Sequence, residues 1–226
     1  MAISQPFVRL ANTTVAWAKD AASGRQDWQA TLAELQKLRG ELERCQRENQ
    51  ILTSELAALR QGDRLLATFP SFRDRSLLAR VTARDILGTH TLMLDRGKAH
   101  GLARDCSVLA PDGVLGRIDQ VWETTSRVQL LSHPAAAAAA QVVGVEGEAL
   151  LLGGERPRLE GFAPFTKVPL GSPVVTTGSE GIYPAGLILG VTGESRLGAL
   201  FTVVPVSLSV RPENALVVLV LCRESP

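Results

Sequence analysis

Few side chains in this sequence are of the types that carry out covalent chemistry, and they are scattered along it. Its three histidines are His90, His100 and His133. Ser179 lies between Gly178 and Gly181 in a segment that weakly resembles a protease serine loop. Acyl transfer by a serine needs a histidine base and an orienting acid within hydrogen-bond reach. His100 is close in sequence to Asp105, but no spacing places either beside Ser179, so we expect a protein that is not an enzyme.

The cysteines and glycines give no sign of a metal or cofactor. Cys45, Cys106 and Cys222 form no CxxC pair and have no metal-ligand spacing. Their odd number rules out complete pairing within one chain, and we expect Cys106 and Cys222 to be reduced or buried thiols. The sequence has no phosphate-binding glycine loop and no Rossmann fingerprint. We therefore expect no cofactor and no metal.

Composition excludes several classes of protein. The chain has 226 residues, of which 45% are hydrophobic, so it has enough apolar surface for a folded core. Its 24 basic and 23 acidic residues give a net charge of +1, which offers no electrostatic basis for binding nucleic acid. No apolar run approaches the roughly 20 residues of a membrane-spanning helix, and the N-terminus does not resemble a signal peptide. Taken literally, the sequence predicts a soluble chain.

A heptad pattern predicts a long helix that pairs with a second copy. Residues that are apolar except for Asn49 recur at alternating gaps of three and four, as the a and d positions of a heptad do: Leu35, Leu38, Leu42, Cys45, Asn49, Leu52, Leu56 and Leu59. Asn49 falls at an a position, where a buried amide favours parallel dimers in register. Glu34 and Glu55 precede the seam residues at g and can meet Arg39 and Arg60 of a partner helix. The alternative is one amphipathic helix packed on the rest of the chain, although such helices usually have a wider apolar stripe.

The same register places Cys45 opposite its counterpart in a parallel dimer. The two thiols could cross-link in an oxidising compartment and would stay reduced in the cytoplasm. Pro6 is tolerated in a first helical turn, so the helix is expected from Pro6 to Gln61.

The rest of the chain predicts many short strands separated by glycine and proline turns, which favours a β-sandwich or a barrel. The expected strands are Leu78–Ile86, His90–Asp95, Ser107–Leu109, Val114–Trp122, Arg127–Leu131, Ala139–Gly144, Glu148–Leu152, Val174–Thr176, Leu187–Thr192, Phe201–Val210 and Leu216–Cys222. Pro134 precedes six alanines, too short a run for an isolated helix, and the end of this run is expected to be a strand. A weak internal repeat of turn and strand signals suggests two similar β-modules.

The turns between these strands carry a family resemblance. Their marked residues are Asp95, Arg96, Gly97, Gly101, Pro111, Asp112, Gly113, Gly116, Gly178, Pro184, Gly186 and Gly190. In order and spacing, residues 76–222 resemble MreC, the bacterial rod shape-determining protein. The resemblance implies a mainly β protein with a long N-terminal helix, in which a parallel coiled coil precedes two small six-stranded β-barrels. The expected divisions are 1–62 for the helical juxtamembrane segment and coiled coil, 63–76 for a linker, 77–132 with 205–222 for the first barrel, and 133–204 for the second.

The resemblance also implies a function: a non-catalytic scaffold of the elongasome that maintains cell shape. Its implied partners are a second copy (a homodimer or higher assemblies), the elongation-specific penicillin-binding transpeptidase, RodA, MreD and MreB. The implied location is the periplasmic face of the inner membrane, where peptidoglycan synthesis takes place, and membrane association would need an anchor that this sequence does not show. Aromatic residues in turn-rich segments, Phe162, Phe165 and Tyr183, are candidate partner contacts, with packing into the barrel core as the more frequent alternative for each.

Two other functions compete with the scaffold. A periplasmic adaptor of a secretion or efflux system also joins a coil to β structure, but it needs two helical arms around a lipoyl-like unit. A degenerate protease of trypsin-like fold is the other, because the barrels of the family resemble that fold.

Overall fold

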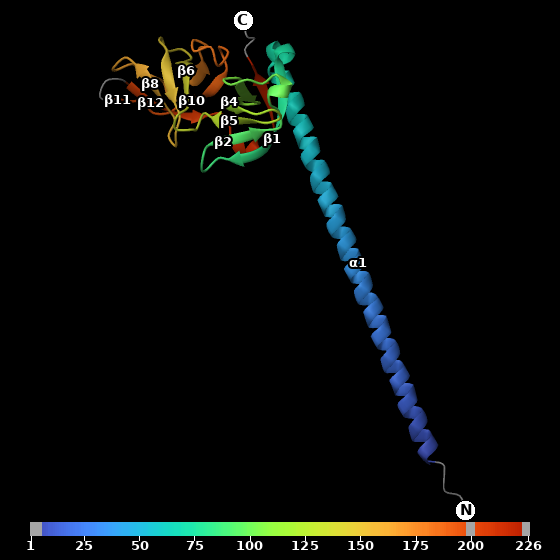
Figure 1. Cartoon of the computed structure of the whole chain (residues 1–226). Coiled ribbons are helices and arrows are strands. Elements are labelled where there is room, and N and C mark those ends of the chain that lie inside the picture. The colour runs from blue at the N-terminus through green and yellow to red at the C-terminus, as the bar shows by residue number, and fades with distance from the viewer. Residues whose placement is uncertain (1–5, 198–201, 223–226) are drawn as a thin grey trace, which may run out of the picture. The chain divides into compact units, whose positions relative to one another are not determined.

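The computed structural model describes the backbone of residues 6–197 and 202–222, and the side chains of Trp28, of 31–196 and of 202–222. It consists of a long helix followed by β structure (Figure 1). The chain divides into two compact units, Met1–Glu55 and Leu56–Pro226.

The helix α1 (Pro6–Thr68) has 63 residues and begins where the sequence predicts. It extends beyond the predicted end, so the first part of the expected linker at 63–76 is helical. The reason is Leu65, which is fully buried and keeps the last turns of the helix packed. Pro70 then begins a 3₁₀ helix, η1 (Pro70–Arg75), because proline cannot continue the helical hydrogen bonds.

Six strands form the first barrel. They are β1 (Ser76–Asp85), β2 (Thr91–Leu94), β3 (Ser107–Ala110), β4 (Gly113–Val121), β5 (Ser126–Leu130) and β13 (Val217–Leu221). All pair antiparallel in the closed order β1-β13-β3-β4-β5-β2. The alternation that predicts the strands also fills the interior, as in β5, where Ser126, Val128 and Leu130 are buried and the residues between them are only half-buried. Short 3₁₀ turns, η2 (Lys98–His100) and η3 (Pro212–Asn214), precede β3 and β13.

The remaining strands form the second barrel. They are β6 (Ala137–Val142), β7 (Ala149–Leu152), β8 (Arg158–Phe162), β9 (Pro173–Thr176), β10 (Ile188–Thr192), β11 (Arg196–Leu197) and β12 (Thr202–Leu208). The sheet order is β10-β9-β6-β7-β8-β12-β11, and pairing of β10 with β12 closes six of these strands into a ring. The fold is therefore the helix and two six-stranded barrels that the resemblance implies.

Two details of the predicted strands need correction. We expected residues 205–222 to return to the first barrel, but β12 pairs with β8 and β10 in the second, and only β13 returns. The sequence analysis also missed the two-residue β11 and missed β8, where Arg158 and Glu160 are charged and Gly161 is a residue rare in strand interiors. The strand predicted at the end of the alanine run is confirmed as β6. Phe201, the first residue of another expected strand, lies outside the described residues.

The two barrels share a hydrophobic cluster. In β3, β4 and β13, every second side chain points away from the interior of the first barrel. Leu109, Val114 and Leu219 in these strands join the buried residues of the second barrel in one cluster, which also contains Leu65 of α1. A Cβ added at Gly113 would lie 2.2 Å from the carbonyl oxygen of Ile188, so the backbones of the two barrels are in close contact there.

The end of α1 is also fixed to the first barrel by one polar side chain. Gln61 Oε1 accepts hydrogen bonds from the backbone N–H groups of Leu216 at 2.9 Å and Val217 at 3.2 Å. Its Nε2 donates to the carbonyl oxygen of Asn214 at 3.4 Å. The Gln61 side chain thus satisfies backbone groups just before and at the start of β13 that have no hydrogen-bond partner in a neighbouring strand.

Candidate functional site

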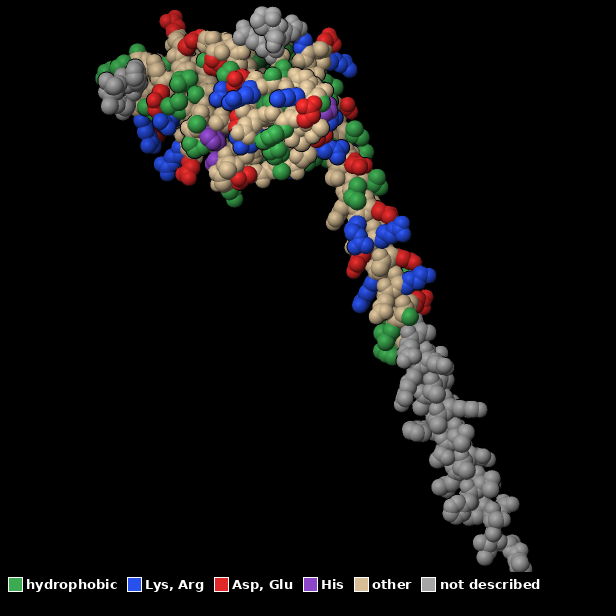
Figure 2. Space-filling model, viewed as in Figure 1, with side chains coloured by type: hydrophobic (Ala, Val, Ile, Leu, Met, Phe, Trp, Pro, Cys, Tyr) green, Lys and Arg blue, Asp and Glu red, His purple; other side chains and the backbone are tan. Residues whose placement is uncertain are grey.

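The predicted seam on α1 is exposed along its described length. Its leucines are Leu35, Leu38, Leu42, Leu52, Leu56 and Leu59, and between 47% and 67% of each side chain is exposed. Large apolar side chains on a helix surface are normally covered, and a row of them marks a surface for association. Acidic and basic side chains accompany the row along the helix (Figure 2). The side chains of the helix before Trp28 lie outside those that the structure describes.

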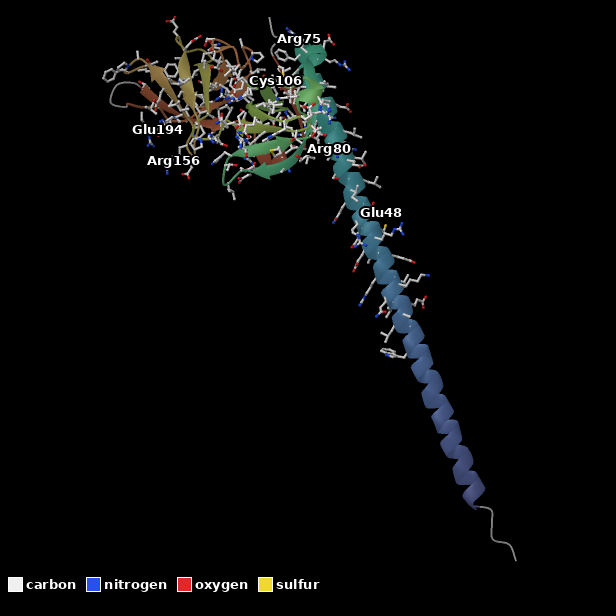
Figure 3. The ribbon with its side chains drawn as sticks, in the orientation of Figure 1. Glu48, Arg75, Arg80, Cys106, Arg156 and Glu194 are labelled. Carbon is white, nitrogen blue, oxygen red and sulfur yellow. A yellow bond between two sulfur atoms is a disulfide. The ribbon has the colours of Figure 1, made fainter. Side chains whose placement is uncertain are left out.

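The polar residues of the predicted seam, Cys45 and Asn49, are exposed on the helix. Cys45 is exposed with a free thiol, and Asn49 donates from Nδ2 to the carbonyl oxygen of Cys45 at 3.0 Å. Within the described residues, the ion pairs on the helix join Arg44 to Glu48 and Arg47 to Glu43. Glu48 projects from the helix (Figure 3). The residues predicted to bridge two helices, Glu34, Arg39, Glu55 and Arg60, make no ion pair in the described chain.

The histidines do not meet the candidate nucleophile. The Ser179 hydroxyl is 2.9 Å from the hydroxyl of Thr177. His90 Nδ1 lies 3.1 Å from Ser132, and His133 Nδ1 accepts from the backbone N–H of Ala135 at 3.0 Å. His100 Nδ1 accepts from the N–H of Gly97 at 3.3 Å, and Asp105 pairs with Arg117 at 3.1 Å instead of with a histidine. Among the described residues, the structure brings no histidine to Ser179, and it assembles no cluster that could hold a metal ion.

The expectation of reduced thiols is wrong for two of the cysteines. Cys106, just before β3, forms a disulfide with Cys222, just after β13, and the two are 116 positions apart in sequence. Because β3 and β13 are neighbouring strands, the bridge closes the C-terminal strand onto the first barrel (Cys106 is labelled in Figure 3). Such disulfides persist in oxidising compartments and are rare in the cytoplasm.

In the first barrel, the turn residues that carry the family resemblance hold the loops in place. Asp95 Oδ1 accepts from the N–H of Arg80 at 2.8 Å, and Arg96 pairs with Asp95 at 3.1 Å. A Cβ at Gly97 would lie 2.3 Å from the carbonyl oxygen of Trp122, so only glycine lets the loop before η2 approach the end of β4. Gly101 ends η2, Pro111 and Asp112 form the turn before Gly113, and Gly116 lies against β5.

In the second barrel, the turn residues that carry the family resemblance lie mostly around one turn. Gly178, Pro184 and Gly186 lie between β9 and β10, where Thr176 Oγ1 donates to the carbonyl oxygen of Pro184 at 2.5 Å. Gly190 lies in β10 against β12. In the same turn, burial raises the pKa of Glu180, whose carboxylate accepts a hydrogen bond from the N–H of Ala139.

Two of the three predicted aromatic contacts are not on the surface. Phe162 and Tyr183 are each 2% exposed and belong to the shared cluster, and burial raises the pKa of the Tyr183 phenol. Phe162 ends β8 after an irregularity in the strand pairing that leaves both it and Leu159 buried, and Tyr183 is buried in the segment between β9 and β10, so neither side chain can meet a partner in this structure. Phe165 is 80% exposed.

Apolar side chains instead gather on the outer side of the second barrel around β9 and β10. The outer patch consists of Val143, Leu170, Val175, Ile188 and Val191. Val175 lies opposite Ile188, and Val191 lies opposite Pro173, whose carbonyl oxygen accepts from the N–H of Val143 at 2.9 Å. Leu170 is the most exposed member at 75%. Sequence analysis missed this patch, because strand alternation shows that one face is outward but does not show that neighbouring strands are apolar on the same side.

None of the helices among the described residues is both long and apolar enough to span a bilayer.

Comparison with known proteins identifies the family. Residues 81–222 match the family model for the barrel core of the rod shape-determining protein MreC. A relative, the cell shape-determining protein MreC of Caulobacter vibrioides, is 33% identical over 161 residues. That match covers 63% of this chain and 46% of the relative, so the chain spans about half of the relative's length.

Solved structures show the same fold. A structure of MreC superposes with a TM-score of 0.68 at 25% identity, covering 76% of this chain and 99% of that one. The complex between penicillin-binding protein PBP2 and MreC from Helicobacter pylori gives a TM-score of 0.54 at 15% identity, covering 65% of this chain and 96% of that one. The family model covers more than half of the sequence, and the chain belongs to the MreC family of rod shape-determining proteins.

Proposed function

We propose that this chain is a non-catalytic scaffold of the cell-elongation machinery. In this proposal α1 pairs two copies in parallel, and the barrels bind the elongation-specific penicillin-binding transpeptidase at the periplasmic face of the inner membrane. Through that complex the chain would couple RodA, MreD and the MreB filament to wall synthesis, and dimers could grow into higher assemblies. The observation that carries the proposal is the exposed seam of α1, which has the spacing of a coiled coil and no cover within the described chain.

The energetics of the seam favour pairing. Burying a leucine side chain contributes about 1.5–3 kcal/mol, and the seam repeats this contribution along the helix. The two charged flanks are complementary in a parallel pair, since Glu34 and Glu55, like Arg39 and Arg60, form no ion pair with any described residue. Asn49 would face its counterpart and exchange hydrogen bonds across the seam, which fixes the register.

The docking part of the proposal is supported by the outer patch and by the partner of a structural relative. The Helicobacter pylori protein of the same fold forms a complex with a penicillin-binding protein. In the present chain, Val191 is exposed in β10 and Leu170 is exposed in the turn that precedes β9, so both can contact a partner without leaving a buried position. The Cys106–Cys222 disulfide supports an oxidising location such as the periplasm.

The competing functions have less support. An adaptor needs two helical arms around a lipoyl-like unit, whereas the described residues contain a single long helix that precedes both barrels. A trypsin-like protease needs a base beside its serine, and Ser179 contacts Thr177 instead.

Light scattering across a concentration series tests the pairing. Leu42→Glu with Leu52→Glu places charges in the seam, and we expect the dimer to become a monomer with intact barrels. The matched control is Gln36→Glu with Gln50→Glu, which adds the same charges to exposed positions outside the seam. A dimer that persists in the seam variant, or a monomeric wild type, would refute pairing through α1.

Interferometry with the purified elongation transpeptidase tests the docking. Leu170→Asp with Val191→Asp should weaken binding at least about tenfold, because each charge must be buried against the partner. The control is Leu87→Asp, which changes a leucine that is 97% exposed on the first barrel. Equal binding by the patch variant and the control would rule out the outer patch as the docking surface.

A further inference from the structure

A pocket on the first barrel shares no residue with the seam or with the outer patch. It has a volume of about 570 Å³, within the range of small-ligand sites. Leu102 and Val121 form part of its apolar lining, and Trp122 presents an indole ring that is 45% exposed. An indole left half exposed beside a pocket offers a flat apolar face to a ligand.

The backbone around the pocket is firmly held. Lys98 donates its backbone N–H to the carbonyl oxygen of Trp122 at 2.9 Å, and Ala99 donates to that of Glu123 at 2.9 Å. The absence of a side chain at Gly97 allows this contact, as described above. The turn therefore fixes the base of the Lys98 side chain beside the indole before any ligand binds.

The charges of the pocket are predominantly positive. Lys98 and Arg104 line it and form no ion pair with the residues that the structure describes. Asp119 also lines it, but its carboxylate receives hydrogen bonds from Arg127 Nε at 3.0 and 3.1 Å. Two unneutralised cations beside an indole favour an anionic ligand with an apolar face.

We propose that this Trp122 pocket binds a carboxylate-bearing sugar of a polysaccharide. A pyranose ring has a face of C–H groups that stacks on an indole, hydroxyl groups that reach the amide of Gln120, and, in an acidic sugar, a carboxylate for Lys98 and Arg104. An acidic peptide provides the charge without the ring, and a neutral glycan provides the ring without the charge. The choice of a wall polysaccharide as the source rests on the proposed function, since that function places the chain beside the wall. The ligand there would be glycan whose N-acetylmuramic acid carboxylate carries no peptide.

The test is a titration followed by tryptophan fluorescence. Trp17→Phe with Trp28→Phe leaves Trp122 as the only indole in the full chain. The probe is the disaccharide of N-acetylglucosamine and N-acetylmuramic acid, compared with its carboxyl amide, with chitobiose and with hexaglutamate. We expect the acidic disaccharide to bind at millimolar concentration, and the amide and chitobiose to bind about tenfold more weakly. Absence of binding, or equal binding of hexaglutamate, would overturn the proposal.

Two variants locate the site. Calorimetry should show loss of binding for Trp122→Ala and loss of discrimination between acid and amide for Lys98→Gln with Arg104→Gln. The matched control, Arg156→Gln with Lys167→Gln, removes two exposed charges outside the pocket and should bind as the parent does. Equal weakening by the control would overturn the assignment to this pocket.

The transpeptidase assay separates this proposal from the docking proposal. Lys98→Gln with Arg104→Gln should keep transpeptidase binding unchanged while losing selectivity for the acidic sugar. Loss of both transpeptidase binding and selectivity for the acidic sugar would show that the pocket belongs to the docking surface, and it would overturn a separate sugar site.

Discussion

Replacing Gln61 with alanine should loosen the end of α1 from the first barrel. The side chain accepts hydrogen bonds from the N–H groups of Leu216 and Val217 and donates to the carbonyl oxygen of Asn214. These three residues lie just before and at the start of β13, more than 150 positions from Gln61. The perturbation therefore tests a long-range contact that no strand pairing can replace.

The expected loss follows from the two N–H groups left without a partner. An unsatisfied buried donor costs about 1–3 kcal/mol. Leu216 and Val217 are only half-buried, so water compensates for part of that cost. Alanine also gains a few tenths of a kcal/mol in helix propensity over glutamine. The free energy of unfolding should fall by about 2 kcal/mol.

Urea unfolding of the full chain, with hydrogen exchange of the Leu216 and Val217 amides, measures the effect. At a slope of about 2 kcal/mol/M, the midpoint should shift by about 1 M, and both amides should exchange faster. Gln61→Glu keeps an accepting oxygen for Leu216 and Val217 but loses the donor to Asn214, so it should lose less stability than Gln61→Ala. Gln50→Ala makes the same change on an exposed part of α1 and should not destabilise. An unchanged midpoint with unchanged amide exchange in Gln61→Ala would refute this reasoning.

Three further substitutions have expected outcomes. Cys106→Ser with Cys222→Ser opens a loop spanning 116 positions and should lower the unfolding free energy by about 2–5 kcal/mol, measured by urea unfolding under oxidising conditions; equal stability would mean the bridge does not form. Asn49→Leu should raise the melting temperature of the paired helix and broaden its oligomer state in light scattering, and an unchanged melting curve would contradict the register. Cys45→Ser should abolish any disulfide-linked dimer on a non-reducing gel, whereas a persistent linked dimer would implicate Cys106 or Cys222.

Local patterns in the sequence were enough to predict the helix and most strands. The seam residues follow heptad spacing over many turns, and the strands show alternation bounded by turn residues. The same approach placed the end of α1 too early, because the burial of Leu65 depends on contacts with both barrels. It missed β8 because only Leu159 and Phe162 in that segment are buried, too few to form a clear alternation.

The interaction surfaces were harder to predict because they combine distant residues. The outer patch joins Val143 to Val191 through β9, and no short window contains both. The disulfide was missed for the same reason, since Cys106 and Cys222 become neighbours only when β13 returns to β3. The turn residues around Gly97 were found as family features, yet their role in forming the Trp122 pocket depends on the close approach of β4.

The contacts at the end of α1 make pairing and docking separable by mutation. Leu65 and Gln61 fix the last turns of the helix to the barrels, whereas Leu42 and Leu52 lie in the exposed seam of the other compact unit. Seam variants should therefore change the number of copies without changing the fold of the barrels. A dimer presents two outer patches, and linked sites can raise apparent affinity for an array of partners by about 10²–10⁴ without a new contact. Pairing through α1 would thus act on transpeptidase binding mainly through avidity, while the outer patch would set the affinity of each copy.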